Sequence, residues 1–64
     1  MDIGNSTRVA QKMTGITSAE LARRLDTSPQ NVTHIQNTRN PRIQRVQNLA
    51  DIFDMEISKF IELK

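Results

Sequence analysis

Residues 17–37 hold two short helix patterns separated by a turn of a few residues, and this pairing restricts the fold more than any other feature. Apolar residues recur at helical spacing on one side of each pattern; they are Leu21, Ala22, Leu25, Val32 and Ile35. Ser28 provides a side-chain oxygen for a helix N-cap, and Pro29 suits the first helical position because its missing N–H is not needed there. We therefore predict helices over residues 18–25 and 29–37 that pack against each other.

The outward face of the second of these helices carries polar side chains without a fixed charge. At about 100° of rotation per residue, four of them lie opposite the apolar side: Gln30, Thr33, His34 and Asn37. Exposed helix faces usually carry charged groups, whereas amides, hydroxyls and a neutral imidazole match the base edges of the major groove. We therefore expect this face to read double-stranded DNA. From composition alone, an ordinary polar surface is the alternative.

Three further helices follow from apolar spacing elsewhere, and strand signals are nearly absent. The first is predicted from about residue 5 to 13, with Val9 and Met13 on one face and Gly15 as its C-terminal stop. The fourth is predicted from core-facing residues, namely Ile43, Val46, Leu49, Ala50 and Phe53. A short last helix contains Ile57, Phe60, Ile61 and Leu63. These patterns predict an all-α fold of five short helices, in a single domain over residues 1–64.

Local signals also predict how these helices begin and end. Thr17 and Glu20 have the spacing of a capping box, in which Thr17 accepts from the Glu20 amide and the Glu20 side chain reaches back to the Thr17 amide. Ile16, just before this box, is expected to turn inward. Asp26 and Asp54 each follow a helix at a position that needs left-handed backbone, which Asp adopts more readily than most residues other than Gly.

The composition argues against several classes of protein. The chain has no cysteine, so it has neither a disulfide framework nor a thiolate metal site, and the single His34 has no partner ligands for zinc. No apolar run approaches the roughly 20 residues needed to span a bilayer, and the N-terminus lacks the basic-then-apolar order of a signal peptide. No nucleophile with an oriented base stands out. We expect a cytoplasmic protein that is not an enzyme and needs no metal or cofactor.

Positive charge is concentrated in the first two thirds of the chain. Up to Arg45 there are seven Arg or Lys residues against three Asp or Glu, whereas the remaining residues carry two against four. A polyanion is therefore attracted to the first part and not to the second. Solvated charge without a partner is the alternative interpretation of so small a difference.

The segment LARRLDTSPQNVTHIQNTRNP, residues 21–41, resembles the helix-turn-helix of the Cro and phage-repressor family, to which lambda repressor also belongs. The positions in register are Leu21, Ala22, Leu25, Ser28, Val32, Thr33, Ile35 and Pro41. The resemblance extends to GIT at residues 15–17 and to LADIFDMEISKFI at residues 49–61. The sequence departs from the family pattern at the following positions: Asp26 and Thr38 stand in place of Gly, Gln36 in place of a common Glu, and Gln11 in place of a bracing Arg.

The resemblance implies a sequence-specific double-stranded DNA-binding regulator, a Cro-like repressor, with its helix-turn-helix at residues 17–37. It implies that the major groove is lined by Ser28, Pro29, Gln30, Thr33 and His34. It also implies that phosphates lie near Ser18, Asn37, Arg39 and Arg42. Gln30 suits a bidentate contact with adenine, His34 suits guanine or a phosphate, and Arg42 suits the backbone or a narrow minor groove.

The last helix predicts a partner surface. Phe60, Ile61 and Leu63 place three large apolar side chains within four residues, more than one core-facing stripe buries in so small a domain. We therefore expect a homodimer on a palindromic operator, weak when free and completed on DNA. The alternative is a protein-interaction module on the same fold, such as an antitoxin or an anti-repressor. An apolar or acidic outward face on helix 29–37 would favour that alternative, and this face is neither.

Overall fold

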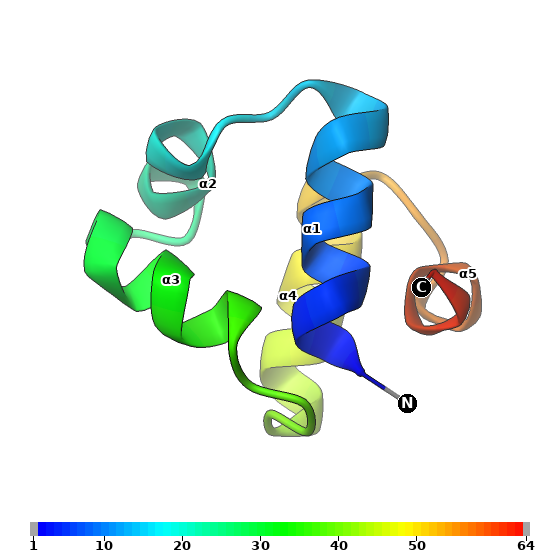
Figure 1. The fold of residues 1–64 in the computed structure, drawn as a ribbon. Coiled ribbons are helices and arrows are strands. Elements are labelled where there is room, and N and C mark those ends of the chain that lie inside the picture. Colours follow the sequence, from blue (N-terminus) through cyan, green and yellow to red (C-terminus); the bar gives the residue numbers. More distant parts are fainter. Residues whose placement is uncertain (1, 64) are drawn as a thin grey trace.

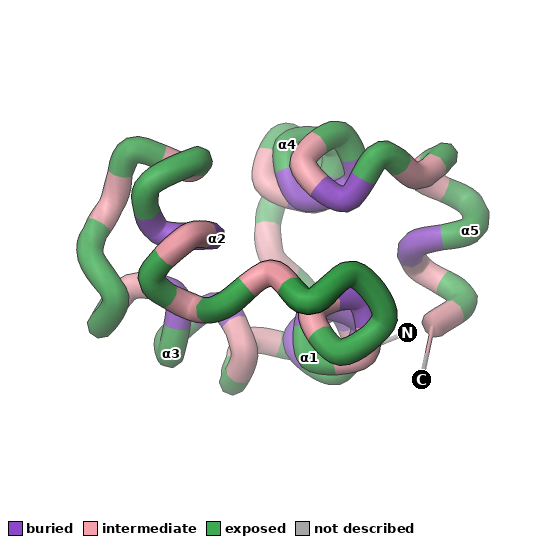
Figure 2. Tube along the Cα trace, turned by 90° about the horizontal axis from the view of Figure 1, so that it is seen from above, coloured by how far each residue is buried: buried purple, intermediate pink, exposed green. Residues whose placement is uncertain are grey.

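The computed structural model describes residues 2–63, and this part of the chain forms five helices and no strand (Figure 1). The helices are α1 (Ile3–Thr14), α2 (Ser18–Arg24), α3 (Pro29–Gln36), α4 (Ile43–Ile52) and α5 (Ile57–Glu62). The predicted all-α fold of five short helices is therefore confirmed. α2 and α3 lie together on one side of α1 and α4, and α5 lies on the other side (Figures 1 and 2). None of the described helices is long and apolar enough to cross a membrane.

The first helix starts earlier and buries a different face than predicted. Asp2 is its N-cap and accepts a hydrogen bond from the Asn5 amide at 3.1 Å. Met13 is 64% exposed and Val9 is only half-buried, so the predicted face is wrong. The buried face consists of small and polar residues instead, together with one large one: Ile3, Gly4, Ser6, Thr7 and Ala10. Apolar spacing missed this face because two of its members carry hydroxyl groups.

Both buried hydroxyl groups of α1 have partners. The Ser6 Oγ donates to the Leu63 carbonyl at 2.6 Å, and the Thr7 Oγ1 donates to the Ile3 carbonyl at 2.8 Å. A buried polar group that keeps its hydrogen bond avoids most of the free energy of desolvation. The Ser6 bond also ties α1 to the end of α5, which explains why a polar residue lies at this helix contact.

The N-terminal end of α1 is joined to the segment that leaves α3. The Ile3 amide donates to the Arg39 carbonyl and the Gly4 amide donates to the Thr38 carbonyl, both at 2.9 Å. These two amides have no acceptor within their own helix, so the α3–α4 connection satisfies them. The approach is close because Gly4 has no side chain: a Cβ placed there would lie 2.3 Å from the Gln36 carbonyl oxygen. The absence of a Cβ at Gly4 therefore allows α1 to approach the end of α3 this closely.

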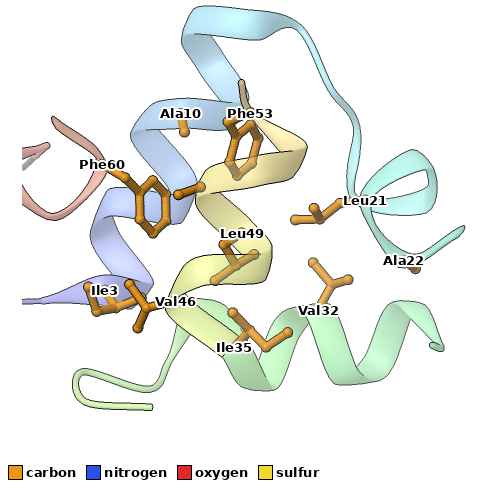
Figure 3. Close-up of a cluster of buried hydrophobic side chains, with 11 residues drawn as sticks. Ile3, Ala10, Leu21, Ala22, Val32, Ile35, Val46, Leu49, Phe53 and Phe60 are labelled. Atoms are coloured by element: carbon orange, nitrogen blue, oxygen red, sulfur yellow. The ribbon is translucent and has the colours of Figure 1, made fainter. Parts of the chain in front are cut away.

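One core joins the five helices, and Figure 3 shows its buried side chains. Val32 and Ile35 point from α3 toward Leu49 of α4. Figure 2 shows that the buried residues of α4 and α5 face the interior of the molecule. Ile43, which was predicted to be part of this core, is 66% exposed. Ile43 is the first residue of α4 and lies beyond the edge of the core. Its spacing from Val46 and Leu49 was therefore not enough to predict whether it is buried.

The last helix corrects the predicted partner surface. Phe60 has no exposed surface and stacks on Phe53 with ring centroids 5.9 Å apart. A side chain buried in the core of its own chain is not available to a second copy, so the prediction that Phe60 forms a dimer interface is wrong. The physical reason is that α5 folds back over α1 and α4 and places this ring against the core. Ile61 and Leu63 are half-buried and pack against the same cluster.

The predicted turns adopt the expected backbone. Gly15, Asp26 and Asp54 have φ angles of 76°, 56° and 56° and occupy the left-handed region. Thr17 caps α2 by accepting from the Glu20 amide at 3.1 Å. The other predicted bond of the capping box, from the Thr17 amide to the Glu20 side chain, is wrong. The Glu20 carboxylate instead accepts hydrogen bonds from Arg23 and Arg24.

Candidate nucleic-acid interface

The two faces of α3 divide as the sequence predicts. The N-cap Ser28 accepts from the Asn31 amide at 3.3 Å, and the helix begins at Pro29. Val32 is fully buried and Ile35 is 3% exposed. The residues proposed for the major groove are all exposed: Ser28, Pro29, Gln30, Thr33 and His34. α3 therefore presents a continuous polar surface, held in place by an apolar side that is anchored in the core.

The side chains on this surface remain free to bind a ligand. Among the described residues, none forms a hydrogen bond with the side-chain amide of Gln30 or with the His34 ring. Thr33 Oγ1 makes only a long contact of 3.4 Å with the Pro29 carbonyl. Burying such polar groups without hydrogen-bond partners would destabilise the fold. Here the groups are exposed, so they can form hydrogen bonds with base edges.

Three of the four residues predicted to lie near phosphates are exposed. Asn37, Arg39 and Arg42 are exposed, whereas Ser18 is half-buried at the start of α2. The Ser18 hydroxyl oxygen lies 3.4 Å from Gln11 Nε2 and 3.5 Å from Gln36 Nε2. The Ser18 side chain therefore contacts both of the glutamine side chains that connect α1 and α3.

Gln11 and Gln36 form an uncharged connection between α1 and α3. Gln36 Nε2 donates to Gln11 Oε1 at 2.7 Å, and Gln11 Nε2 donates to the Ile16 carbonyl at 3.2 Å. Because both partners are neutral amides, added salt should weaken this connection less than it would weaken an ion pair. Sequence reasoning noted both residues separately but missed that they contact each other.

An open groove of about 560 Å³ runs between α3 and the first part of α4. Its lining combines apolar surface with polar side chains, among them His34, Arg42, Gln44, Arg45 and Asn48. Gln44 Nε2 donates to Asn48 Oδ1 at 3.1 Å, so two of the lining amides on α4 are hydrogen-bonded to each other. Sequence analysis singled out only His34 and Arg42 here. Gln44 and Arg45 were not identified, because which outward positions of α4 adjoin α3 depends on the packing of the two helices.

A second, smaller hollow lies at the C-terminal end of α3. Its volume is about 270 Å³, and its lining consists of Asp2, Asn5, Arg8, Gln36, Asn37 and Arg39. The Arg8 Nη2 donates to Asn37 Oδ1 at 2.8 Å. The sequence analysis did not identify Arg8 as a site residue, because nothing in the local pattern relates it to a residue so distant along the chain.

Two other arginines, Arg23 and Arg24, form ion pairs with Glu20 on α2. Arg24 Nε lies 2.8 Å from Glu20 Oε2, and Arg23 contacts the other carboxylate oxygen. These hydrogen bonds, first from Arg24 and then from Arg23, hold the pKa of Glu20 below its usual value. Glu20 therefore offsets part of the positive charge of Arg23 and Arg24.

Comparison with known families agrees with this geometry. The family model described as the Cro/C1-type HTH DNA-binding domain matches residues 8–64. The chain belongs to the Cro/C1-type helix-turn-helix family. The resemblance inferred from residues 21–41 is thereby confirmed, and DNA binding is the function that the family supports. A search of curated proteins finds no match to the sequence.

The chain departs from the sequence pattern of this family at four positions, and the structure shows how each residue is accommodated. Asp26, in place of the turn Gly, adopts the left-handed backbone that the turn needs. Gln11 and Gln36, in place of the charged residues, are bonded to each other. Thr38, in place of a second Gly, has its hydroxyl bonded to the His34 carbonyl at 2.7 Å. Each departure is accommodated locally, and the outward face of α3 stays exposed.

Proposed function

We propose that this Cro/C1-type protein is a sequence-specific transcriptional regulator, a Cro-like repressor, which reads the major groove with α3. The observation that supports this most directly is the outward face of α3. It is exposed, uncharged and able to donate and accept hydrogen bonds, while the opposite face is buried. Amide and hydroxyl groups in this arrangement match the donor and acceptor pattern of base pairs.

Each residue of the interface has a proposed role. Gln30 makes a bidentate contact with adenine N6 and N7, and His34 donates to guanine or to a phosphate. Ser28, Pro29 and Thr33 complete the surface that enters the groove. Phosphate contacts set the position of the protein on the duplex without reading its sequence. We assign these contacts to Ser18, Asn37, Arg39 and Arg42.

A single copy contacts too few base pairs to select one site in a genome. α3 has eight residues, which corresponds to about 12 Å at 1.5 Å per residue. We therefore propose a homodimer on a palindromic operator, with half-sites about 34–36 Å apart. Ile61 and Leu63 of α5, which are only half-buried, form its contact. The contact is small, so the dimer is completed on DNA.

Selection of bound sites from random duplexes tests this function. We expect the enriched sites to contain an inverted repeat with one-turn spacing. Gln30→Ala should lower affinity for the enriched site by about 1–3 kcal/mol and leave affinity for random DNA nearly unchanged. Gln47→Ala, an exposed glutamine on α4, is the matched control and should change neither affinity.

Three outcomes would contradict parts of the proposal. Equal losses on selected and random DNA for Gln30→Ala would remove Gln30 from base reading. One protomer per site at saturation in sedimentation, with an asymmetric site, would contradict the dimer. If no sequence is enriched, the protein-interaction module becomes the better interpretation of the fold.

A further inference from the structure

The hollow at the C-terminal end of α3 gathers two guanidinium groups from different elements. Arg8 comes from α1 and Arg39 from the α3–α4 connection, and Asn37, the C-cap of α3, also lines the hollow. Figure 1 shows the N-terminal part of α1 beside this end of α3. The site is therefore assembled by tertiary structure, at the edge of the surface that we propose for DNA.

The backbone around this hollow is held in place. The Ile3 and Gly4 amides donate to the Arg39 and Thr38 carbonyls at 2.9 Å, so α1 is bonded directly to the segment that carries Arg39. Arg8 follows Gly4 by about one helical turn. A side chain that projects from such a fixed backbone loses less conformational freedom when it binds a ligand than one on a mobile loop.

The donors in this hollow suit a phosphate group. A guanidinium offers several N–H groups in a planar arrangement that matches phosphate oxygens. Arg8 uses its Nη2 for Asn37 Oδ1 and has further N–H groups to offer. Because Asn37 accepts from Arg8 through its oxygen, its Nδ2 group can serve as an additional donor.

Asp2 is the one acidic side chain in the lining. Its Oδ1 accepts from the Asn5 amide, and its Oδ2 lies 3.9 Å from Arg39 Nε. Asp2 therefore offsets part of the positive charge of Arg39, but its nearest contacts do not involve Arg8. The charge balance of the hollow remains positive, with two arginines against one aspartate.

We propose that Arg8 binds a backbone phosphate of the duplex at the C-terminal end of α3, together with Asn37 and Arg39. α1 thereby becomes a third element of the DNA interface, in addition to the helix-turn-helix. This inference rests on the proposed DNA binding by α3. The ligand is a phosphodiester of the duplex, because only the duplex also engages the outward face of α3.

Binding to a random-sequence duplex at several salt concentrations tests the role of Arg8, since phosphate contacts do not depend on sequence. Arg8→Ala should weaken binding at low salt by roughly 10-fold and reduce the slope of log affinity against log salt by about 0.9. Arg8→Lys should keep the slope, because it keeps the charge. Lys12→Ala is the matched control: this lysine is exposed on the next turn of α1 but does not line the hollow, so its slope should equal that of the wild type.

The acidic residue provides a second and opposite test. Asp2→Asn keeps the N-cap, because Asn caps about as well as Asp, but removes the negative charge. We expect tighter binding to random DNA, by a few-fold at low salt, and we expect this gain to shrink when Arg39→Ala is also present. Thermal melting of each variant verifies that α1 stays folded.

Failure of this inference can be told apart from failure of the proposed function. If the wild type does not bind duplex DNA at low salt, the proposed function is wrong. If the wild type binds but Arg8→Ala keeps its salt slope, or Lys12→Ala loses as much, the phosphate contact of Arg8 is wrong. If millimolar inorganic phosphate at matched ionic strength perturbs the Asn37 amide signals as strongly as duplex DNA, the hollow is a site for free phosphate and the assignment to the duplex is overturned.

Discussion

Replacing Gly4 with Ala tests how closely α1 crosses the end of α3. A Cβ at this position would lie 2.3 Å from the Gln36 carbonyl oxygen, 2.7 Å from the Gln36 carbonyl carbon and 3.0 Å from the Thr38 oxygen. All three atoms belong to the backbone, so none can rotate away. Because ordinary contact begins at 3.4 Å, α1 would have to move by about 1 Å relative to α3.

The size of the effect follows from the bonds that this movement strains. The Ile3–Arg39 and Gly4–Thr38 hydrogen bonds, both 2.9 Å long, would lengthen toward 4 Å, and each contributes about 1 kcal/mol. Repacking of the crowded contact adds about 1–3 kcal/mol, whereas the helix preference of Ala over Gly returns about 1 kcal/mol. We expect a net destabilisation of about 2–4 kcal/mol, which lowers the melting temperature of so small a domain by roughly 10–20 °C.

Thermal and urea unfolding, followed by circular dichroism, measure this effect. Asn5→Ala is the matched control, because it introduces the same residue at the next position of α1, where the side chain is exposed. The control should melt close to the wild type or slightly above it. If Gly4→Ala also melted at or above the wild type, helix preference would dominate and the close approach of α1 to α3 would be refuted.

Three further predictions concern the turn, the ion pair and the amide connection. Asp26→Gly should be neutral or should stabilise the fold by up to about 1 kcal/mol, since φ is 56° there; a lower melting temperature would show that the Asp side chain itself stabilises the turn. The pKa of Glu20 is lowered by Arg24 and Arg23 from its usual 4.5, so its contribution to stability is complete above that pH and is lost as the pH falls through the lowered pKa. The melting temperatures of the wild type and Glu20→Gln should therefore converge in acid, and a constant difference down to strongly acidic pH would contradict the pairing. Gln36→Met removes a neutral hydrogen bond to α1 and should lower stability by about 1 kcal/mol, equally at low and high salt; a loss that fades with salt would mean that charge is involved.

The local signals of the helix-turn-helix were readable from the sequence because each depends on a few neighbouring residues. The Thr17 and Ser28 hydroxyls cap the helices that follow them. Asp26 and Asp54 adopt left-handed backbone as predicted, because steric limits on φ act within one residue. The apolar residues Val32 and Ile35 fix the inward side of α3, and this in turn defines its outward face.

Only the tertiary structure decided which residues are buried and which distant groups meet. Phe60 was expected at a partner surface but lies in the core, because α5 folds back over α1 and α4. Met13 and Ile43 fit helical apolar patterns and are nevertheless exposed, since no other element covers them. The contact of Arg8 with Asn37 likewise depends on how α1 crosses α3. Helix ends and faces follow from short-range sterics and hydrogen bonds, whereas burial and the composition of the hollow follow from long-range packing, which no local pattern specifies.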